Sequence, residues 1–447
     1  MSANRAGLER INSWVSAEYE LTDTIDLFAD VLMAQNESFG RYAPPAASGP
    51  TIPGDPRNNV GATFGYFRWT DIGTRDNTVN DTLTDINIGA RGALTGNITW
   101  EAYYTYSNYT SASIGNYYLN YAGLDYNINN GIDDFDQFVA NIKHTTVNDD
   151  RQKLQKVFAG MQFDMFEMSG GTSSAYAAVE YFKLDYVALV DAQSEAGLVG
   201  GSAGNSAEGY RDVTAGSIEA IFPIFDWWEI DAALRYDDYS DFGSATSPRL
   251  GTILSIPGVD AWRFKASWGE GFRAPNLSSL YGATSFSAEF ATDYYGCELA
   301  GISLSDCPER QFDTYIGSNP ELDAEESETW SVGVEWRFAD RWMTSLNYFN
   351  LAITNSINYT SAQDQLDVDY QTNGGNPNVT RSATGAVTRV EAGFQNGSTE
   401  FEYESIDWAL SGGIDSGFGD WGLRANASYD LNYDAEVSYG TGELYDA

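Results

Sequence analysis

Residues 262–273 read Trp-Arg-Phe-Lys-Ala-Ser-Trp-Gly-Glu-Gly-Phe-Arg, and this stretch decides the fold class. Apolar side chains alternate strictly with charged or small polar ones. One face of an extended strand would therefore carry Trp262, Phe264, Ala266 and Trp268. Alternation with a period of two over about ten residues is typical of a β-strand whose two faces meet different environments.

The same alternation recurs along the whole chain and predicts about fourteen strands. They are 13–21, 26–36, 82–94, 98–110, 154–166, 174–187, 210–222, 227–239, 247–256, 261–272, 329–338, 342–354, 400–413 and 421–431. Tight turns such as Gly96-Asn97 connect them at one end. Long loops rich in Gly, Asn, Asp, Ser and Tyr connect them at the other, over 37–81, 111–153, 188–209, 274–326 and 355–399.

Short turns at one end and long loops at the other are the signature of an antiparallel transmembrane β-barrel. We therefore predict an all-β chain whose charged strand faces line a lumen and whose apolar faces meet lipid. Aromatic residues near strand ends, such as Trp228 and Trp342, fit an interfacial girdle. A soluble β-sandwich or propeller shares the alternation and stays open as an alternative at this point.

Composition excludes several classes of function. The 447 residues carry a formal net charge of −40, from 64 Asp and Glu against 24 Lys and Arg, so the surface would repel nucleic acid. Aromatic residues make up 14% of the chain, which argues against disorder. One His and two Cys leave little material for a zinc site, haem ligation or a His-based triad. We expect no cofactor and no enzymatic activity.

Three stretches, in order, resemble the barrel of TonB-dependent outer-membrane receptors. They are Ala-Leu-Arg-Tyr-Asp-Asp-Tyr-Ser-Asp-Phe-Gly at 233–243, Gly-Phe-Arg-Ala-Pro-Asn-Leu at 271–277, and Asn-Pro-Glu-Leu-Asp-Ala-Glu-Glu-Ser-Glu-Thr-Trp at 319–330. The resemblance implies that 1–447 is part of such a barrel, about 14 strands of a type with about 22. Members of the family carry a signal peptide, a TonB box and a plug domain. We identify none of these in the sequence and expect a fragment of a longer receptor.

The motif at 271–277 also has a physical rationale. Pro275 has no N–H to donate and biases Ala274 towards an extended conformation, so strand pairing ends there. Arg273 lies beside a carboxylate-rich rim, where it can tie the strand end to the loop through charge-assisted hydrogen bonds. We expect Arg273, Pro275 and Asn276 to end a strand rather than to contact a ligand.

The resemblance implies a receptor in the outer membrane of a Gram-negative bacterium, surrounded by outer-membrane lipid. It would bind a siderophore, cobalamin or an oligosaccharide through its outer loops and lumen. A TonB-type energy-coupling protein would drive uptake through a plug outside this chain. The alternatives are a passive porin-like channel and a soluble carbohydrate-binding β-protein.

Aromatic residues in the long loops are the candidates for binding a small-molecule ligand, because their rings stack and their polar tips form hydrogen bonds. They are Tyr117, Tyr118, Tyr121, Tyr126, Tyr281, Phe286, Phe290, Tyr294, Tyr295 and Tyr315. Packing of the loops against themselves is the alternative for each of them.

Three further features lie in the loops. Cys297 and Cys307 are expected to form a disulfide in an oxidising compartment. The segment 125–136 is reminiscent of a calcium loop, but its Gly is one place late and an Asp stands where a Glu belongs, so a solvated acidic loop is favoured. The candidate ligands would be Asp125, Asn127, Asn129 and Asp133. His144 has no nucleophile or metal partner in view and is expected to be exposed.

Overall fold

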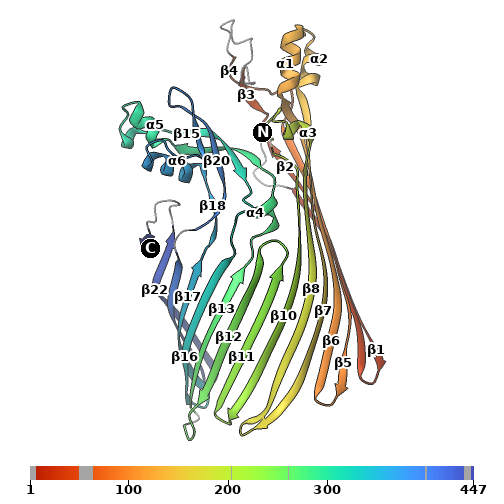
Figure 1. Ribbon diagram of the computed structural model, residues 1–447, viewed down its shortest axis with the longest axis vertical. Helices are drawn as coiled ribbons and strands as arrows, with labels where there is room; N and C mark the ends of the chain where they lie inside the picture. The colour runs from red at the N-terminus through yellow and green to blue at the C-terminus, as the bar shows by residue number, and fades with distance from the viewer. Residues whose placement is uncertain are drawn as a thin grey trace.

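The computed structural model describes residues 7–49, 64–202, 204–259, 261–397, 400–436 and 444–446. Its main feature is one large antiparallel sheet, in which strands follow one another in chain order (Figure 1). The long strands are β1 (Gly7–Thr22), β2 (Ile25–Tyr42), β5 (Arg75–Thr95), β6 (Ile98–Asn120), β7 (Lys143–Met168), β8 (Gly171–Val190), β10 (Ala207–Phe225), β11 (Trp228–Tyr239), β12 (Gly243–Ser255), β13 (Trp262–Arg273), β16 (Glu325–Ala339), β17 (Trp342–Thr354), β21 (Phe401–Ser416) and β22 (Gly419–Glu436). Two short strands join this sheet, β9 (Val199–Gly200) beside β6 and β23 (Leu444–Asp446) beside β22.

Each predicted strand segment coincides with one of these long strands, so the prediction of a large antiparallel sheet is confirmed. Among the described residues no pairing joins β1 to β22 or β23, and the sheet forms a curved wall rather than a closed cylinder (Figure 1). Several strands are longer than predicted. β7 has 26 residues and β6 has 23, because both continue into segments whose polar composition indicated loops.

The two faces of the sheet differ in chemistry, as the alternation predicts. On the apolar face, Trp330 and Val332 keep 48% and 57% of their surface exposed. On the other face, Glu180 accepts from Lys156 at 2.6 Å and also pairs with Arg235. Such pairing keeps the polar face hydrated and charged, whereas the apolar face presents a continuous hydrocarbon surface.

The short-turn end of the sheet carries clustered aromatic rings. Trp262 and Trp336, directly opposite each other on β13 and β16, stack with ring centroids 5.1 Å apart. Trp227, at the turn between β10 and β11, stacks on Phe225 at 5.2 Å. Amphipathic rings grouped at one level of a sheet are typical of an interfacial girdle.

The loop end is more ordered than predicted, because two of the loops fold together into a second sheet. We call it the loop unit. It contains β14 (Ser285–Thr292), β15 (Glu309–Gly317), β18 (Ile357–Thr360), β19 (Val379–Arg381) and β20 (Val387–Asn396), with α5 (Tyr294–Leu299), a 3-10 turn (Leu304–Asp306) and α6 (Ala362–Gln371). Its apolar core is formed by Ala291, Ala362, Leu366, Val379 and Val390. The segments 274–326 and 355–399 thus connect strands of the large sheet as predicted, but they carry helices and strands that their sequence did not indicate.

The remaining loops carry smaller elements. They are α1 (Tyr121–Asn130), α2 (Phe135–Ile142), α3 (Ala192–Glu195), α4 (Leu277–Tyr281) and the hairpin β3 (Ala46–Gly49) and β4 (Phe64–Arg68). Leu119, Leu124 and Ile142 are buried together where α1 and α2 pack over the end of β6. No helix in the described part of the chain is both long enough and apolar enough to cross a membrane.

Candidate functional site

Two cavities open among the loops, and the first brings together three of the predicted aromatic residues. We call it the loop cavity. It has a volume of about 590 Å³ and lies between the start of α1, the segments 195–201 and 204–205, and the loop unit. The side chains that give it chemical character are Tyr121, Glu195, Asn205, Phe286, Asp313, Tyr315 and Arg389.

The aromatic wall of the loop cavity follows from strand register. Phe286 on β14 lies directly opposite Tyr315 on β15, and their rings meet edge to face with centroids 5.5 Å apart. The guanidinium carbon of Arg389, on β20, lies 3.7 Å from the centroid of the Tyr315 ring. A guanidinium stacked on a ring holds its charge in a fixed place while its edge stays available for hydrogen bonds.

The opposite wall is formed where α1 meets the segment that carries β9. The backbone N–H of Tyr121 donates to the carbonyl of Leu198 at 2.8 Å, which fixes the ring at the cavity edge. The pKa of Tyr121 is raised above its ordinary value, first by burial of the phenol and then by the nearby charge of Asp313. The hydroxyl therefore stays protonated and able to donate a hydrogen bond.

The loop cavity combines ring surfaces with charged groups of both signs, because Glu195 and Asp313 line it together with Arg389. Two tyrosines and one phenylalanine supply ring faces and edges, and Arg389 supplies the positive charge. Arg389 also pairs with Glu391 at 3.0 Å, but both side chains are about half exposed, so a ligand can compete for the guanidinium. Arg389 is not singled out by the sequence, because an arginine in a polar loop has no distinguishing spacing.

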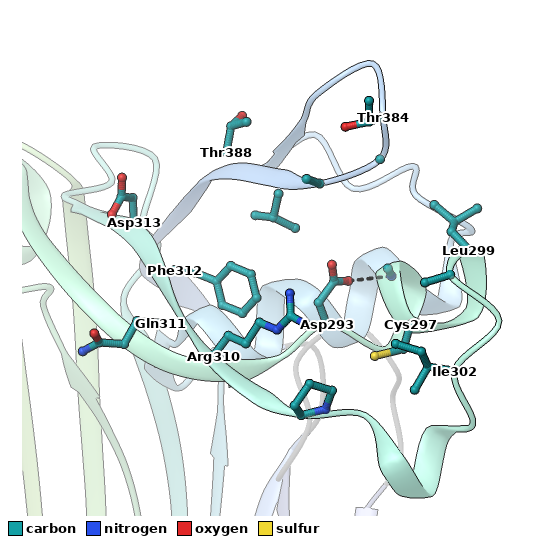
Figure 2. Close-up of a pocket in the computed structure, with 16 residues that line it drawn as sticks. Asp293, Cys297, Leu299, Ile302, Arg310, Gln311, Phe312, Asp313, Thr384 and Thr388 are labelled. Atoms are coloured by element: carbon teal, nitrogen blue, oxygen red, sulfur yellow. Dashed lines mark hydrogen bonds between the residues drawn. The ribbon is translucent and has the colours of Figure 1, made fainter. Parts of the chain in front are cut away.

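The second cavity, of about 670 Å³, lies within the loop unit between β15 and β20 (Figure 2). Arg310 and Phe312 line it from β15, while Thr384 and Thr388 line it from the segment that includes β20. Asp313 lines both cavities. We call this second one the strand cleft.

The other predicted aromatic residues near the start of the loops lie outside the loop cavity. Tyr118 is buried, and its hydroxyl is within hydrogen-bond distance of the Asn77 side chain. Tyr117 has a left-handed backbone, with φ of 65°, and its ring lies 5.8 Å from the amine of Lys143. Tyr126 is 54% exposed on α1.

The other predicted aromatic residues of the fourth long loop, 274–326, divide between packing and exposure. Tyr294 packs against Tyr370 with centroids 6.0 Å apart, and Tyr295 stacks with the guanidinium of Arg381 at 5.0 Å. Tyr281 lies on α4, where burial raises its pKa. Phe290 is 64% exposed. The structure thus gathers Tyr121, Phe286 and Tyr315 and leaves the others apart.

The motif residues lie at the junction between sheet and loops. Arg273, the last residue of β13, pairs with Glu325, the first residue of β16. Asn276 precedes α4 without a side-chain capping bond. The carbonyl of Pro275 accepts a hydrogen bond at 2.9 Å from the buried guanidinium of Arg211. These contacts join strand ends to loops.

The cysteines and the acidic segment have contrasting outcomes. Cys297 and Cys307 are joined in a disulfide that links α5 to the start of β15. The suggested calcium loop is not a loop, because Asp125, Asn127 and Asn129 lie in helix α1, where successive side chains point in different directions. The Asn127 amide is buried and donates to the carbonyl of Phe138 at 2.8 Å.

Asp133 follows α1 in the turn before α2, so the four suggested calcium ligands do not surround one point. Within the described ranges, no group of three or more His, Cys, Asp or Glu residues is placed to hold a metal ion.

The expectation for His144 is wrong. Its Nε2 lies 2.9 Å from Oδ1 of Asp191, and its side chain is only 14% exposed. Burial alone raises the pKa of Asp191, but hydrogen bonds from Ser194 and His144 outweigh it, so the pKa lies below its ordinary value. The missed signal is Asp191 itself, which precedes Ser194 by three residues and caps α3.

The fold and the junction contacts define a large antiparallel sheet of the kind that builds outer-membrane β-barrels, with a ligand-sized cavity in its loops. The family described as "TonB dependent receptor-like, beta-barrel" matches residues 18–446. The chain therefore belongs to the TonB-dependent receptor β-barrel family, whose members are transporters rather than enzymes and reside in the outer membrane of Gram-negative bacteria.

The chain spans only part of the length of the proteins that it resembles. The ferric enterobactin receptor PirA of Pseudomonas aeruginosa is 30% identical over 178 residues, which is 40% of this chain and 21% of that receptor. The solved structure of the RagAB peptide transporter is 13% identical and has a TM-score of 0.56, covering 99% of this chain and 47% of that one. The closed-closed state of the RagAB peptide importer has a TM-score of 0.58, with 49% of its chain covered. These structures share the fold of this chain, which spans about half their length.

Proposed function

We propose that this chain forms the barrel of an outer-membrane receptor that takes up a ferric siderophore, with the loop cavity as an outer binding site. The observation that carries the proposal is the Arg389 guanidinium held 3.7 Å from the centroid of the Tyr315 ring at the wall of that cavity. Siderophores that chelate iron through anionic aromatic groups need ring surfaces and positive charge together, and this wall supplies both.

Two other ligand classes are compatible with the family. A neutral oligosaccharide would use the aromatic rings but would gain little from Arg389. Cobalamin offers a large planar surface with fewer negative charges. The 30% identity to a ferric enterobactin receptor, over 40% of this chain, supports the siderophore. In this proposal a TonB-type protein energises uptake through a plug domain outside the chain, which separates the receptor from a passive channel.

Binding of ferric enterobactin to the purified chain in detergent tests the proposal, with quenching of intrinsic fluorescence as the signal. Y315A removes the ring and R389Q removes the charge, and each is expected to weaken binding about tenfold. Y126A is the matched control, because Tyr126 is 54% exposed and does not line the loop cavity.

Equal affinity of R389Q and the unchanged chain for ferric enterobactin would contradict the siderophore. Should R389Q retain binding while Y315A loses it, a neutral ligand such as an oligosaccharide becomes the better candidate. Binding that survives both substitutions would remove the loop cavity from the proposal.

A further inference from the structure

The strand cleft exists because two strands pair only in part. β15 and β20 run parallel and pair from Thr314 with Val390 to Gly317 with Gly393. Before these pairs the two strands separate, and the cleft lies in the wedge between them (Figure 2). On its other edge β15 pairs with β14, and β20 pairs with β19. In this part of the described chain, the two edges that face each other across the cleft pair with no other strand.

Two facing strand edges form a template for a third strand. An unpaired edge presents N–H and C=O groups at strand spacing, and neighbouring strands lie about 4.8 Å apart. A chain inserted in the wedge would therefore meet Phe312 and Asp313 on one side and Val387 and Thr388 on the other. A volume of about 670 Å³ is in the range of sites that hold small ligands or short peptide segments.

The walls of the strand cleft are held in place from behind. The disulfide between Cys297 and Cys307 ties α5 to the start of β15. Arg381 donates to the carbonyl of Gly385 at 2.8 Å, which fixes the turn that leads into β20. A preformed wedge lowers the entropic cost of binding an extended chain.

The cleft also has apolar and charged features that select a ligand. Leu299 and Ile302 line it and are 58% and 37% exposed, so they offer contact surface to alternate side chains. Arg310 lines it too, and within the described residues no carboxylate forms a salt bridge with it. The nearby Asp293 already accepts from Arg381 at 2.7 Å. The Arg310 guanidinium lies close enough to Asp293 to help lower the pKa of that carboxyl, but within the described residues its side chain donates no hydrogen bond, so its N–H groups can pair with a carboxylate on the incoming ligand.

We propose that the strand cleft binds an extended peptide segment that carries a carboxylate, by adding it as a strand between β15 and β20. The peptide backbone forms the ladder hydrogen bonds, Leu299 and Ile302 contact its side chains, and Arg310 pairs with the carboxylate. The inference goes beyond the proposed siderophore uptake and does not rest on it, because it concerns a different cavity and an equilibrium binding event.

The test uses the whole chain in detergent and a fluorescein-labelled pentapeptide of alternating valine and threonine with a free C-terminal carboxylate. Fluorescence anisotropy measures its binding. The matched probe has the same side chains but carries N-methyl groups on alternate residues, which remove the N–H donors of one edge. Strand addition predicts at least a tenfold loss of affinity for the methylated probe. Equal affinity of the two probes would overturn the proposal.

Two variants test the charge. R310Q is expected to weaken binding of the free-carboxylate peptide about tenfold and to leave a C-terminally amidated peptide unaffected. R151Q changes the net charge equally on β7, away from the cleft, and is expected to bind like the unchanged chain. Equal loss in R310Q and R151Q would attribute binding to overall charge and refute the site.

Excess ferric enterobactin separates the two proposals. The peptide is expected to stay bound in its presence, whether or not the loop cavity binds the siderophore. Displacement of the peptide by ferric enterobactin would place it in the loop cavity and refute the strand cleft as its site. Failure of siderophore binding with intact, methylation-sensitive peptide binding would refute the proposed function alone.

Discussion

Replacing Arg381 by methionine is the sharpest test of what holds the loop unit together. The guanidinium pairs with Asp293 at 2.7 Å and with Asp369 at 2.6 Å, and it joins segments 88 residues apart in the chain. The side chain of Arg381 is 11% exposed and that of Asp369 is fully buried. Removing one partner of a buried ion pair costs about 3–5 kcal/mol, because the other charges stay buried without compensation.

The expected loss is a large share of the stability of a small unit. A cost of about 3–5 kcal/mol corresponds to a loss of roughly two to three and a half orders of magnitude in protection against amide hydrogen exchange. We expect this loss across β19 and β20, measured by mass spectrometry on the chain in detergent, while β10 and β11 keep their protection. R389M is the control, because Arg389 and Glu391 are 42% and 55% exposed and such a pair contributes about 1 kcal/mol at most.

The pH dependence of hydrogen-exchange protection in the loop unit is a second measurement, and it is expected to have opposite signs in R381M and in the unchanged chain. Burial by itself raises the pKa of Asp293, but hydrogen bonds from Arg381 and from the Gly296 N–H outweigh it, and the pKa lies below its ordinary value. In the unchanged chain this carboxylate therefore stabilises the loop unit above about pH 4, and its contribution is lost as the pH falls through the lowered pKa.

In R381M the carboxylate of Asp293 loses the guanidinium that most lowers its pKa, and burial is then opposed only by the Gly296 N–H and the charge of Arg310. Protonation of Asp293 relieves its buried charge, so protection in β20 is expected to increase as the pH is lowered from 7 towards 5. Protection in R381M that matches R389M, or that does not increase between pH 7 and pH 5, would refute the reasoning.

Three more predictions follow from the junctions and loops. C297S/C307S is expected to destabilise the loop unit by about 3 kcal/mol, since the disulfide closes a loop between two residues that are 10 positions apart. Limited proteolysis should cleave this variant at the same rate as the unchanged chain whose disulfide has been reduced. R211M is expected to lower the thermal midpoint much more than R273M, because the Arg211 side chain is 7% exposed and that of Arg273 is 65% exposed; equal shifts would contradict this. D191A removes the N-cap of α3 and is expected to lower the stability of this segment by about 1 kcal/mol or more. The measurement is amide hydrogen exchange at 192–200, which should become faster; unchanged exchange there would show that the cap is dispensable.

The sequence predicted the large sheet well because each strand has two faces in different media. Trp330 and Val332 on one face and Ser331 and Gly333 on the other leave no ambiguity of period, and β16 carries them as predicted. Strand ends were less predictable. β7 begins at Lys143, where both faces are polar and the alternation of apolar and polar residues fades.

The loop unit could not be predicted, because its structure comes from contacts distant in sequence. The pairing of Thr314 with Val390 joins two loops that are separated by β16 and β17. Neither strand shows an alternation that stands out from its polar surroundings. The candidate site was accordingly predicted by residue type alone. That sufficed for Tyr121, Phe286 and Tyr315 but missed Arg389, whose role depends on the ring beneath it.

The motif at 271–277 is explained by what a proline does to the end of a strand. Pro275 stops the ladder of β13, and its carbonyl is left at a junction that excludes water. An unsatisfied buried carbonyl would cost about 1–3 kcal/mol, and Arg211 from β10 removes that cost by donating to it at 2.9 Å. Asp241, beyond β11, neutralises the same guanidinium at 2.7 Å. One buried charge pair thus joins β10 and the turn after β11 to the loop that follows β13, so the proline of this stretch ends the strand at a junction that an arginine distant in sequence stabilises.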